Sequence, residues 1–303
     1  HASIFFSYVG HSILVYFSYL FSPISKKTGS STMRKLLNIL VKVLILCLII
    51  IWLIPVVWLL VTSLKSENTV MTDKLSLIFT PTLENYKKAF SSTLLGRWLV
   101  NSLIVSVITT ILTLLIDSTM AYVLARIQFR GRNVLFIFIL AGMMIPFEVL
   151  IIQLYLELTK MGLANTLIAV MLPRLAMPIG VFILTQFFKS IPIVLEEAAF
   201  IDGASRFTVF RTIIMPLSKS ALFAVAIISF INAWNDFLWP LVAISSSEKY
   251  TITVGIANFQ GTHGTEYSLI MAGAVLASIP QIIMYILFKK NIVKSIAMTG
   301  IKE

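Results

Sequence analysis

Residues 189–219 read KSIPIVLEEAAFIDGASRFTVFRTIIMPLSK, a charged segment that separates two long apolar stretches, 166–188 and 220–244. Each apolar stretch is long enough to cross the hydrocarbon core of a bilayer, which takes about 20 residues of helix. The whole chain agrees, because 58% of its 303 residues are hydrophobic and 12% are charged, against roughly 45–50% and about 25% in soluble domains. The sequence therefore predicts an all-α, polytopic membrane protein.

Six apolar stretches predict six transmembrane helices. They lie at 38–64, 98–125, 134–156, 166–188, 220–244 and 268–288. Fifteen of the 24 Lys and Arg residues fall before the first stretch or after the second, fourth and sixth, and seven fall in the alternate segments. Because positively charged loops remain in the cytoplasm, the N- and C-termini of the six-span unit and the loop 189–219 are predicted to be cytoplasmic.

The remaining segments divide the chain further. Residues 1–32 precede Met33, where two basic residues and an apolar span are typical of a natural start, so they are expected to be a non-native or extra apolar extension. A true additional span or interfacial helix is the alternative. Residues 33–97 hold the first span and an external loop with some helix around 83–90. Residues 98–288 form the core, and 289–303 form a basic cytoplasmic tail suited to lipid headgroups.

The charged segment has a secondary-structure pattern of its own. Pro192 suits the entry to a short helix over 195–201, because a proline in the first turn removes no hydrogen bond. Asp202-Gly203 is typical of a turn. A second helix is predicted over 205–215, where Pro216 ends or kinks it.

The spacing within this segment resembles a known signature. Glu197-Ala198-Ala199, Gly203 after three intervening residues, and then Ile213 and Met215-Pro216 are similar to the EAA signature of binding-protein-dependent ABC importer permeases. Other stretches resemble the carbohydrate-uptake, MalG-like branch of that family: 121–132 (AYVLARIQFRGR), 162–166 (GLANT), 234–241 (WNDFLWPL) and 294–302 (KSIAMTGIK). The resemblance covers the chain from about Met33 to Lys302.

The resemblance implies a permease subunit of an ATP-driven sugar or oligosaccharide importer that works by alternating access. The loop would be a coupling helix that docks on a separate ATPase. This implies an ATPase-coupling role for Glu196, Glu197, Ala198, Ala199, Asp202, Gly203 and Arg206. Implied partners are a second, MalF-like permease, two ABC ATPase subunits that bind ATP and Mg, and an extracellular or periplasmic solute-binding protein. The implied location is the bacterial plasma (inner) membrane.

Several other functions are excluded by the residues. The sequence has no Gly-x-x-x-x-Gly-Lys-Ser/Thr phosphate loop and no hydrolase motif, so we expect it not to be an enzyme and to hold no cofactor of its own. Cys47 is the one cysteine, and His1, His11 and His263 are too scattered to predict a metal site. The net charge of +11 is explained by cytoplasmic loops facing anionic membrane lipid, so nucleic acid is not an expected partner.

Polar residues within apolar spans are costly and usually face a bundle interior or a water-filled path. The candidates for the substrate path are therefore Asn232, Trp234, Asn235, Asp236, Glu148 and Arg174. Residues 232–236, in the middle of the fifth predicted span, combine an aromatic ring with amides and a carboxylate, as sugar sites do; packing or gating before Pro240 explains them equally well. Arg174, between Pro173 and Pro178, and Glu148, after Pro146, lie in spans broken by proline. They are expected to pair with each other or to line the path, and a structural ion pair or a position near the interface is favoured for each. For Asp117 a helix-stabilising or partner contact is favoured.

The residues leave two questions undecided: the cargo, and the role of one external segment. A non-sugar solute such as a glycerol phosphate ester is an alternative cargo. An ATP-independent secondary transporter is an alternative class, but it leaves the charged loop unexplained. The glycine-rich stretch 261–267 is expected to close a turn, with contact to a solute-binding protein as the alternative.

Overall fold

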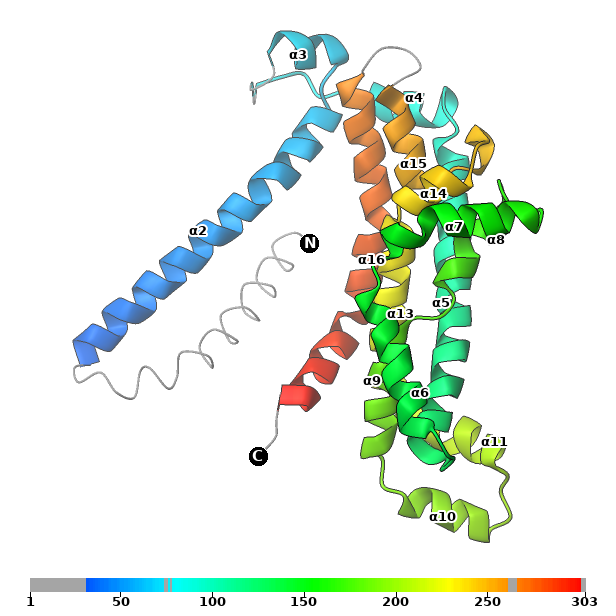
Figure 1. Cartoon of the computed structure of the whole chain (residues 1–303). Helices are drawn as coiled ribbons and strands as arrows, with labels where there is room; N and C mark the ends of the chain where they lie inside the picture. The colour runs from blue at the N-terminus through cyan, green and yellow to red at the C-terminus, as the bar shows by residue number, and fades with distance from the viewer. Residues whose placement is uncertain (1–30, 74–75, 77, 261–265, 301–303) are drawn as a thin grey trace. The chain divides into compact units, whose positions relative to one another are not determined.

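The computed structural model describes residues 31–73, 76, 78–260 and 266–300, and in them all regular secondary structure is helical (Figure 1). The longer helices are α2 (Ser31–Ser63), α5 (Leu95–Arg126), α6 (Arg132–Ala141), α7 (Phe147–Lys160), α9 (Pro178–Ser190), α13 (Lys219–Asn235) and α16 (Tyr267–Gly300). The shorter helices and helical turns are α3 (Glu67–Thr72), α4 (Glu84–Ser91), η1 (Gly142–Met144), α8 (Leu167–Met171), η2 (Leu172–Arg174), α10 (Val194–Ile201), α11 (Arg206–Val209), η3 (Phe210–Ile214), α12 (Met215–Leu217), α14 (Leu238–Ala243), η4 (Ser247–Lys249), α15 (Ile252–Ala257) and η5 (Asn258–Gln260). The predicted all-α class is confirmed. Of the predicted extension 1–32, the structure describes only residues 31 and 32, which begin α2. His263 also lies outside the described residues.

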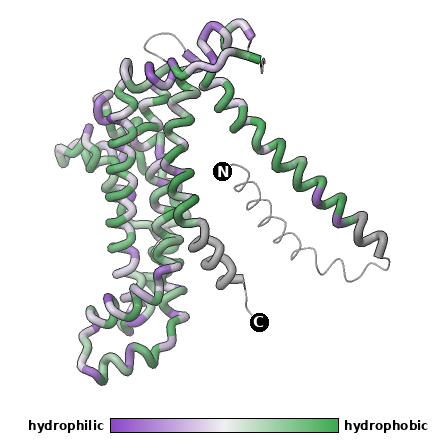
Figure 2. The backbone as a smooth tube through the Cα atoms, turned by 180° about the vertical axis from the view of Figure 1, so that it is seen from behind, coloured by the Kyte–Doolittle hydropathy of each residue, from purple (hydrophilic) through white to green (hydrophobic). Residues whose placement is uncertain are grey.

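The chain divides into two units, 1–61 and 62–303. Most of the described first unit is α2, whose segment Leu37–Ser63 is long and apolar enough to cross a membrane. Figure 2 shows this helix as hydrophobic along most of its described length. Pro55 lies inside it, where the missing N–H removes one backbone hydrogen bond.

The second unit is built around α5, which packs against α9 and α13, while α13 packs in turn against α16. α5 and the segment Tyr267–Phe288 of α16 are continuous helices that are long and apolar enough to span a membrane. On its buried side α5 carries small hydroxyl residues such as Ser106 and Thr113. Small side chains let neighbouring helices approach closely, which is how helices associate in lipid.

Three of the six predicted spans are not single helices, and two of these are broken near the prolines that indicated breaks in the sequence. α6 with η1 meets α7 at 97°, α8 with η2 meets α9 at 46°, and the pair Arg206–Leu217 and α13 is bent by 80°. The stretch 220–244 likewise consists of α13 and α14 with a break between them. The described residues therefore contain three unbroken spans, or up to six if each bent pair is one span.

Prolines explain two of these bends. Pro146 immediately precedes α7, and Pro178 is the first residue of α9. Proline has no N–H to donate and disfavours helical conformation in the residue before it, so a helix approaching it ends and a new helix begins. The apolar composition continues through each bend, which is why composition alone indicated one span.

The two ends of the second unit carry different short helices. In Figure 1, α10 and α11 lie at one end, beside the last turns of α5 and α9, and α4 and α15 lie at the opposite end. α4 matches the helix predicted around 83–90. The carboxylate of Glu67 accepts hydrogen bonds from the backbone N–H of Tyr267 (3.1 Å) and Ser268 (2.8 Å). The loop before α5 is thereby fastened to the first turn of α16, whose free N–H groups favour an anion.

Candidate functional site

The first helix of the charged loop ends in a Schellman motif. The Gly203 N–H donates to the Phe200 carbonyl (3.1 Å) and the Ala204 N–H donates to the Ala199 carbonyl (2.9 Å), the two bonds that define this helix end. Gly203 has φ +82°, a conformation that glycine adopts without the steric cost other residues incur. The turn predicted at Asp202-Gly203 is confirmed. Glycine is favoured at position 203 because the backbone there has a positive φ.

A substitution at Gly203 should therefore act through backbone strain. A Cβ added there would have no atom within 4 Å, so crowding is not involved. We expect Gly203→Ala to destabilise the helix end by about 1–2 kcal/mol and Gly203→Val to do more. Hydrogen exchange of the 200–205 amides should be faster in both variants and unchanged in Gly142→Ala, which has a helical φ of −57° at an unrelated position. Equal exchange in Gly203→Val and the unmodified chain would contradict this explanation.

The second helix of the loop begins as predicted but is divided. The Ser205 hydroxyl accepts a hydrogen bond from the Thr208 N–H (3.2 Å) and so caps the first turn of α11. α11 is followed by the π-helical turn η3 and then by α12, a short helix that contains Pro216 and ends at Leu217. The short loop helices α10 and α11 therefore meet at a single tight turn.

The seven residues predicted to couple to an ATPase do not share one environment. Glu197, Ala198, Asp202, Gly203 and Arg206 are exposed, Ala199 is half-buried, and Glu196 is only 3% exposed. Two large apolar side chains on the same loop, Ile201 (87% exposed) and Phe207 (69% exposed), face away from the bundle core. Exposed apolar groups among polar ones are typical of protein interaction surfaces. We call the exposed residues within 197–207 the coupling surface, after the role that the sequence predicts for them.

Glu196 instead makes a buried ion pair with the last residue of α5. Its Oε1 lies 2.6 Å from Nε of Arg126, and Nη2 of Arg126 donates to the Ile191 carbonyl (2.6 Å). Arg126 thus fastens both α10 and the chain leading into it. The sequence analysis quoted Arg126 only as part of 121–132 and missed this role. The available signal was an arginine at the end of a long apolar helix, followed 70 residues later by two adjacent glutamates.

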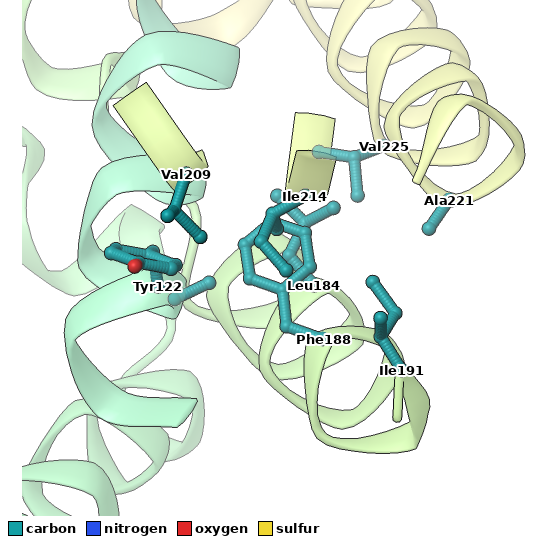
Figure 3. Close-up of a cluster of buried hydrophobic side chains, with 9 residues drawn as sticks. Tyr122, Leu184, Phe188, Ile191, Val209, Ile214, Ala221 and Val225 are labelled. Carbon is teal, nitrogen blue, oxygen red and sulfur yellow. The ribbon is translucent and has the colours of Figure 1, made fainter. Parts of the chain in front are cut away.

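A hydrophobic cluster joins the loop to the bundle (Figure 3). Val209 and Ile214 from the loop pack with Tyr122 of α5 and with Leu184 and Phe188 of α9. All five side chains are almost fully buried. Because packed cores transmit displacement rather than absorb it, a movement of the loop has to move the ends of α5 and α9 with it.

Inside the bundle, Arg174 pairs with Asp236. Nε and Nη2 of Arg174 lie 2.9 Å and 2.8 Å from Oδ2 of Asp236, and the guanidinium carbon lies 3.6 Å from the ring centre of Phe147. A structural ion pair was one of the two favoured predictions for Arg174, beside a position near the interface, but the suggested partner, Glu148, was wrong. Glu148 lies exposed in the first turn of α7. The Arg174 pair brings together the break before α9, the start of α7 and the end of α13.

Residues 232–236 lie at the end of α13 and not in the middle of a helix as predicted, because α13 ends at Asn235 and Asp236 follows it. The Trp234 ring is 2% exposed and stacks on Phe230 with ring centres 5.8 Å apart. Its Nε1–H donates to the Ala277 carbonyl (3.1 Å). Such a ring offers no open face to a sugar, so in this structure Trp234 serves packing.

Four of the six candidate path residues line two separate cavities, and Asp236 and Glu148 line neither. One, of about 240 Å³, is lined by Thr109, Phe147, Arg174, Ser229, Asn232 and Ala233 among others, and we call it the break cavity. The other, of about 450 Å³, is lined by Trp234, Asn235, Thr253, Ala274 and Gln281 among others, and we call it the apolar cavity. The side-chain amides of Gln281 and Asn235 are hydrogen-bonded to each other there.

Asp117 of α5 is hydrogen-bonded to the backbone at the break before α9. Its Oδ1 accepts a hydrogen bond from the Met177 N–H (3.2 Å), immediately before the first residue of α9. The helix-stabilising contact favoured for this residue is confirmed. A Cβ at Gly180 would lie 2.1 Å from Oδ2 of Asp117, so this carboxylate fits only beside a glycine.

Two motifs quoted for their resemblance have structural contacts as well. Asn165, at φ +59°, accepts hydrogen bonds from the backbone N–H of Ser245 (3.2 Å) and Ser246 (3.0 Å). The fully buried Trp239 donates from Nε1 to the Ala169 carbonyl (3.1 Å). These contacts fasten α14 and the chain after it to the segment that begins α8.

Comparison with known proteins places this arrangement in a family. Residues 117–297 match the family model described as the binding-protein-dependent transport system inner membrane component. An arabinooligosaccharide transport system permease protein, AraQ, of Halalkalibacterium halodurans is 35% identical over 82% of this chain and 90% of its own length. A trehalose/maltose transport system permease protein, MalG, of Thermococcus litoralis is 38% identical over 84% of this chain and 92% of its own length.

A solved structure has the same fold. The crystal structure of a bacterial ABC transporter involved in the import of the acidic polysaccharide alginate contains a chain with a TM-score of 0.76 and 22% identity to this one. The match covers 87% of this chain and 99% of that chain. The family match and the similarity to permeases along most of their length lead to one conclusion: this chain belongs to the binding-protein-dependent transport system inner membrane components, the membrane-embedded and non-catalytic subunits of ABC importers.

Proposed function

We propose that this chain is a permease subunit of an ATP-driven carbohydrate importer. Its relatives are named for the transport of arabino-oligosaccharides and of trehalose and maltose. The chain is similar to them along nearly their whole length, which favours the same role and the same broad class of cargo. A sugar or oligosaccharide is therefore the cargo we assign to it.

The observation that carries the proposal is the coupling surface and the way it is fastened. Most of residues 197–207 are exposed, while Glu196 and the cluster around Val209 are buried against α5 and α9. A surface that is open on one side and fixed to spanning helices on the other can receive a movement and pass it on. ATP binding in a partner would move the loop, and the bundle would change between outward-open and inward-open states.

The proposed assembly follows from this role. A second, MalF-like permease would complete the path, two ATPase subunits would bind ATP and Mg, and a solute-binding protein would deliver sugar from outside. The coupling surface and both ends of the six-span unit would face the cytoplasm of a bacterial inner membrane, as the distribution of Lys and Arg favours.

The test is ATP hydrolysis and sugar uptake by the complete assembly in lipid vesicles. The vesicles hold this chain, its partner permease and the ATPase, with maltose, trehalose or arabinobiose supplied on the solute-binding protein. We expect a loaded binding protein to stimulate hydrolysis and ATP to be required for uptake. Ile201→Ser and Phe207→Ser should reduce both, because they remove apolar area from the coupling surface.

Two results would overturn the proposal. Uptake that proceeds without ATP would indicate a secondary transporter. Stimulation by a binding protein loaded with glycerol phosphate and by none loaded with sugar would keep the importer mechanism but replace the cargo. Exposed Glu157 on α7, changed to serine, provides a matched surface control that should leave hydrolysis and uptake unchanged.

A further inference from the structure

The break cavity lies where several interrupted helices meet. Its walls come from α5 (Thr109), the start of α7 (Phe147), the turn before α9 (Arg174) and the last turns of α13 (Ser229 and Asn232). At about 240 Å³ it is slightly smaller than the roughly 300–1,000 Å³ sites that hold drug-sized ligands. Its size suits one sugar ring of a longer chain.

Three uncharged polar residues, Thr109, Ser229 and Asn232, lie in the wall of the cavity. Thr109 is 1% exposed, and its hydroxyl has no hydrogen-bond partner among the described residues. Asn232 adds an amide whose Nδ2 has only a distant contact, 3.9 Å, with the sulfur of Met177. Ser229 supplies a further hydroxyl to the same wall.

The charge of the cavity is balanced. Arg174 directs two nitrogens at the carboxylate of Asp236, at 2.9 Å and 2.8 Å. A guanidinium has five N–H donors, so others remain for a ligand, while the neighbouring carboxylate cancels its charge. The cavity thus offers several donors and acceptors with no net charge, which suits hydroxyl groups better than a phosphate or carboxylate.

We propose that the break cavity is a subsite for one neutral sugar ring, contributed by this chain to the transport path. The inference rests on the proposed function and specifies its substrate class. The apolar cavity is the poorer alternative, because its tryptophan is covered and its two amides are hydrogen-bonded to each other. The hydrogen bond between the two amides uses part of their donor and acceptor capacity, and most of the remaining lining residues are apolar.

The test uses the purified complex of this chain, its partner permease and the ATPase, without binding protein. Saturation-transfer difference NMR detects weak sugar binding directly, with maltose, trehalose and arabinobiose as neutral probes and methyl glucuronide as an anionic one. Ala233→Leu fills the break cavity, and Ala274→Leu makes the same change in the apolar cavity. Asn232→Ala removes a hydrogen-bonding group while leaving more room.

We expect saturation transfer to a neutral probe in the unmodified complex and in Ala274→Leu, its loss in Ala233→Leu, and about three- to tenfold weaker binding in Asn232→Ala. The proposal is overturned if Ala233→Leu binds normally, which places the sugar on the partner permease, or if no neutral probe binds. It is also overturned if methyl glucuronide binds as well as the neutral probes.

Two further outcomes are distinguished by parallel measurements. If Ala233→Leu prevents assembly with the partner permease while Asn232→Ala leaves sugar binding unchanged, a partner side chain occupies the cavity and the subsite is refuted. ATP-dependent sugar uptake by the unmodified complex, measured separately, tests the importer itself. Normal uptake with a refuted subsite leaves the proposed function intact, whereas absent uptake removes the basis of both.

Discussion

Replacing Glu196 with glutamine should uncouple the loop from α5 and produce the largest loss of stability among single changes on the loop. The substitution leaves Arg126 buried without its counter-charge, 2.6 Å from a neutral amide in place of a carboxylate. Breaking a buried pair by removing one partner costs about 3–5 kcal/mol. We expect a lower melting temperature of the purified complex and loss of sugar uptake, while the partner ATPase keeps its own basal hydrolysis.

The control for this prediction is an exposed pair on the same chain. Lys160 and Glu157 lie 3.0 Å apart with both side chains largely exposed, and surface pairs of this kind contribute about 0–1 kcal/mol. Glu157→Gln should therefore leave melting and uptake unchanged. The double variant Arg126→Glu with Glu196→Arg reverses the charges of the pair. It should melt at a higher temperature than either Arg126→Glu or Glu196→Arg alone. Equal effects of Glu196→Gln and Glu157→Gln would refute the structural role of the buried pair.

Replacing Gly255 with alanine should destabilise the opposite end of the bundle. An added Cβ would lie 2.1 Å from one ring carbon of Trp98 and 2.2 Å from another. The ring cannot turn away easily, because Trp98 is buried and its Nε1–H donates to the Ser247 carbonyl at 2.7 Å. Overpacking of this kind costs about 1–3 kcal/mol or more, visible as a lower melting temperature and a lower yield of folded protein.

Gly96 provides the matched control, two residues from Trp98 on the same helix. A Cβ there would lie 3.7 Å from the Phe90 ring, which is ordinary contact, and alanine favours helix over glycine by about 0.5–1 kcal/mol. Gly96→Ala should therefore be neutral or stabilising. A double variant Gly255→Ala with Trp98→Leu should recover part of the stability by removing the clash. If Gly255→Ala has the same melting temperature as the unmodified chain, α15 and α5 do not pack closely enough for the added Cβ to clash with Trp98, and the prediction is refuted.

Much of the architecture followed from the sequence because its signals are local. Apolar stretches, the distribution of Lys and Arg, and the Asp202-Gly203 turn each depend on neighbouring residues. The helix predicted over 195–201 is present as α10, and the one around 83–90 is present as α4. The prolines near Glu148 and Arg174 indicated breaks in two spans, but a hydropathy window averages over prolines and does not give the size of a bend.

The roles of single polar residues followed the sequence less well. Glu196 and Glu197 are adjacent and chemically identical, yet one is buried against Arg126 and the other is exposed. Trp234 and Asn232 are two residues apart, yet one packs against Phe230 and the other lines the break cavity. On a helix, neighbouring residues point in different directions, and only the packing of other helices decides which direction is buried.

The sequence by itself determined that this chain is a membrane protein of apolar helices with a charged loop whose helix–turn–helix pattern needs glycine at position 203. Composition and local backbone preference suffice for that, since both act over a few residues. The tertiary structure alone decided that Arg126 pairs with Glu196, that Arg174 pairs with Asp236, and that a cavity with a few polar groups in its wall lies between interrupted helices. These partners are about 60–70 residues apart in the chain, and only the packing of the folded helices brings their charges within hydrogen-bonding distance.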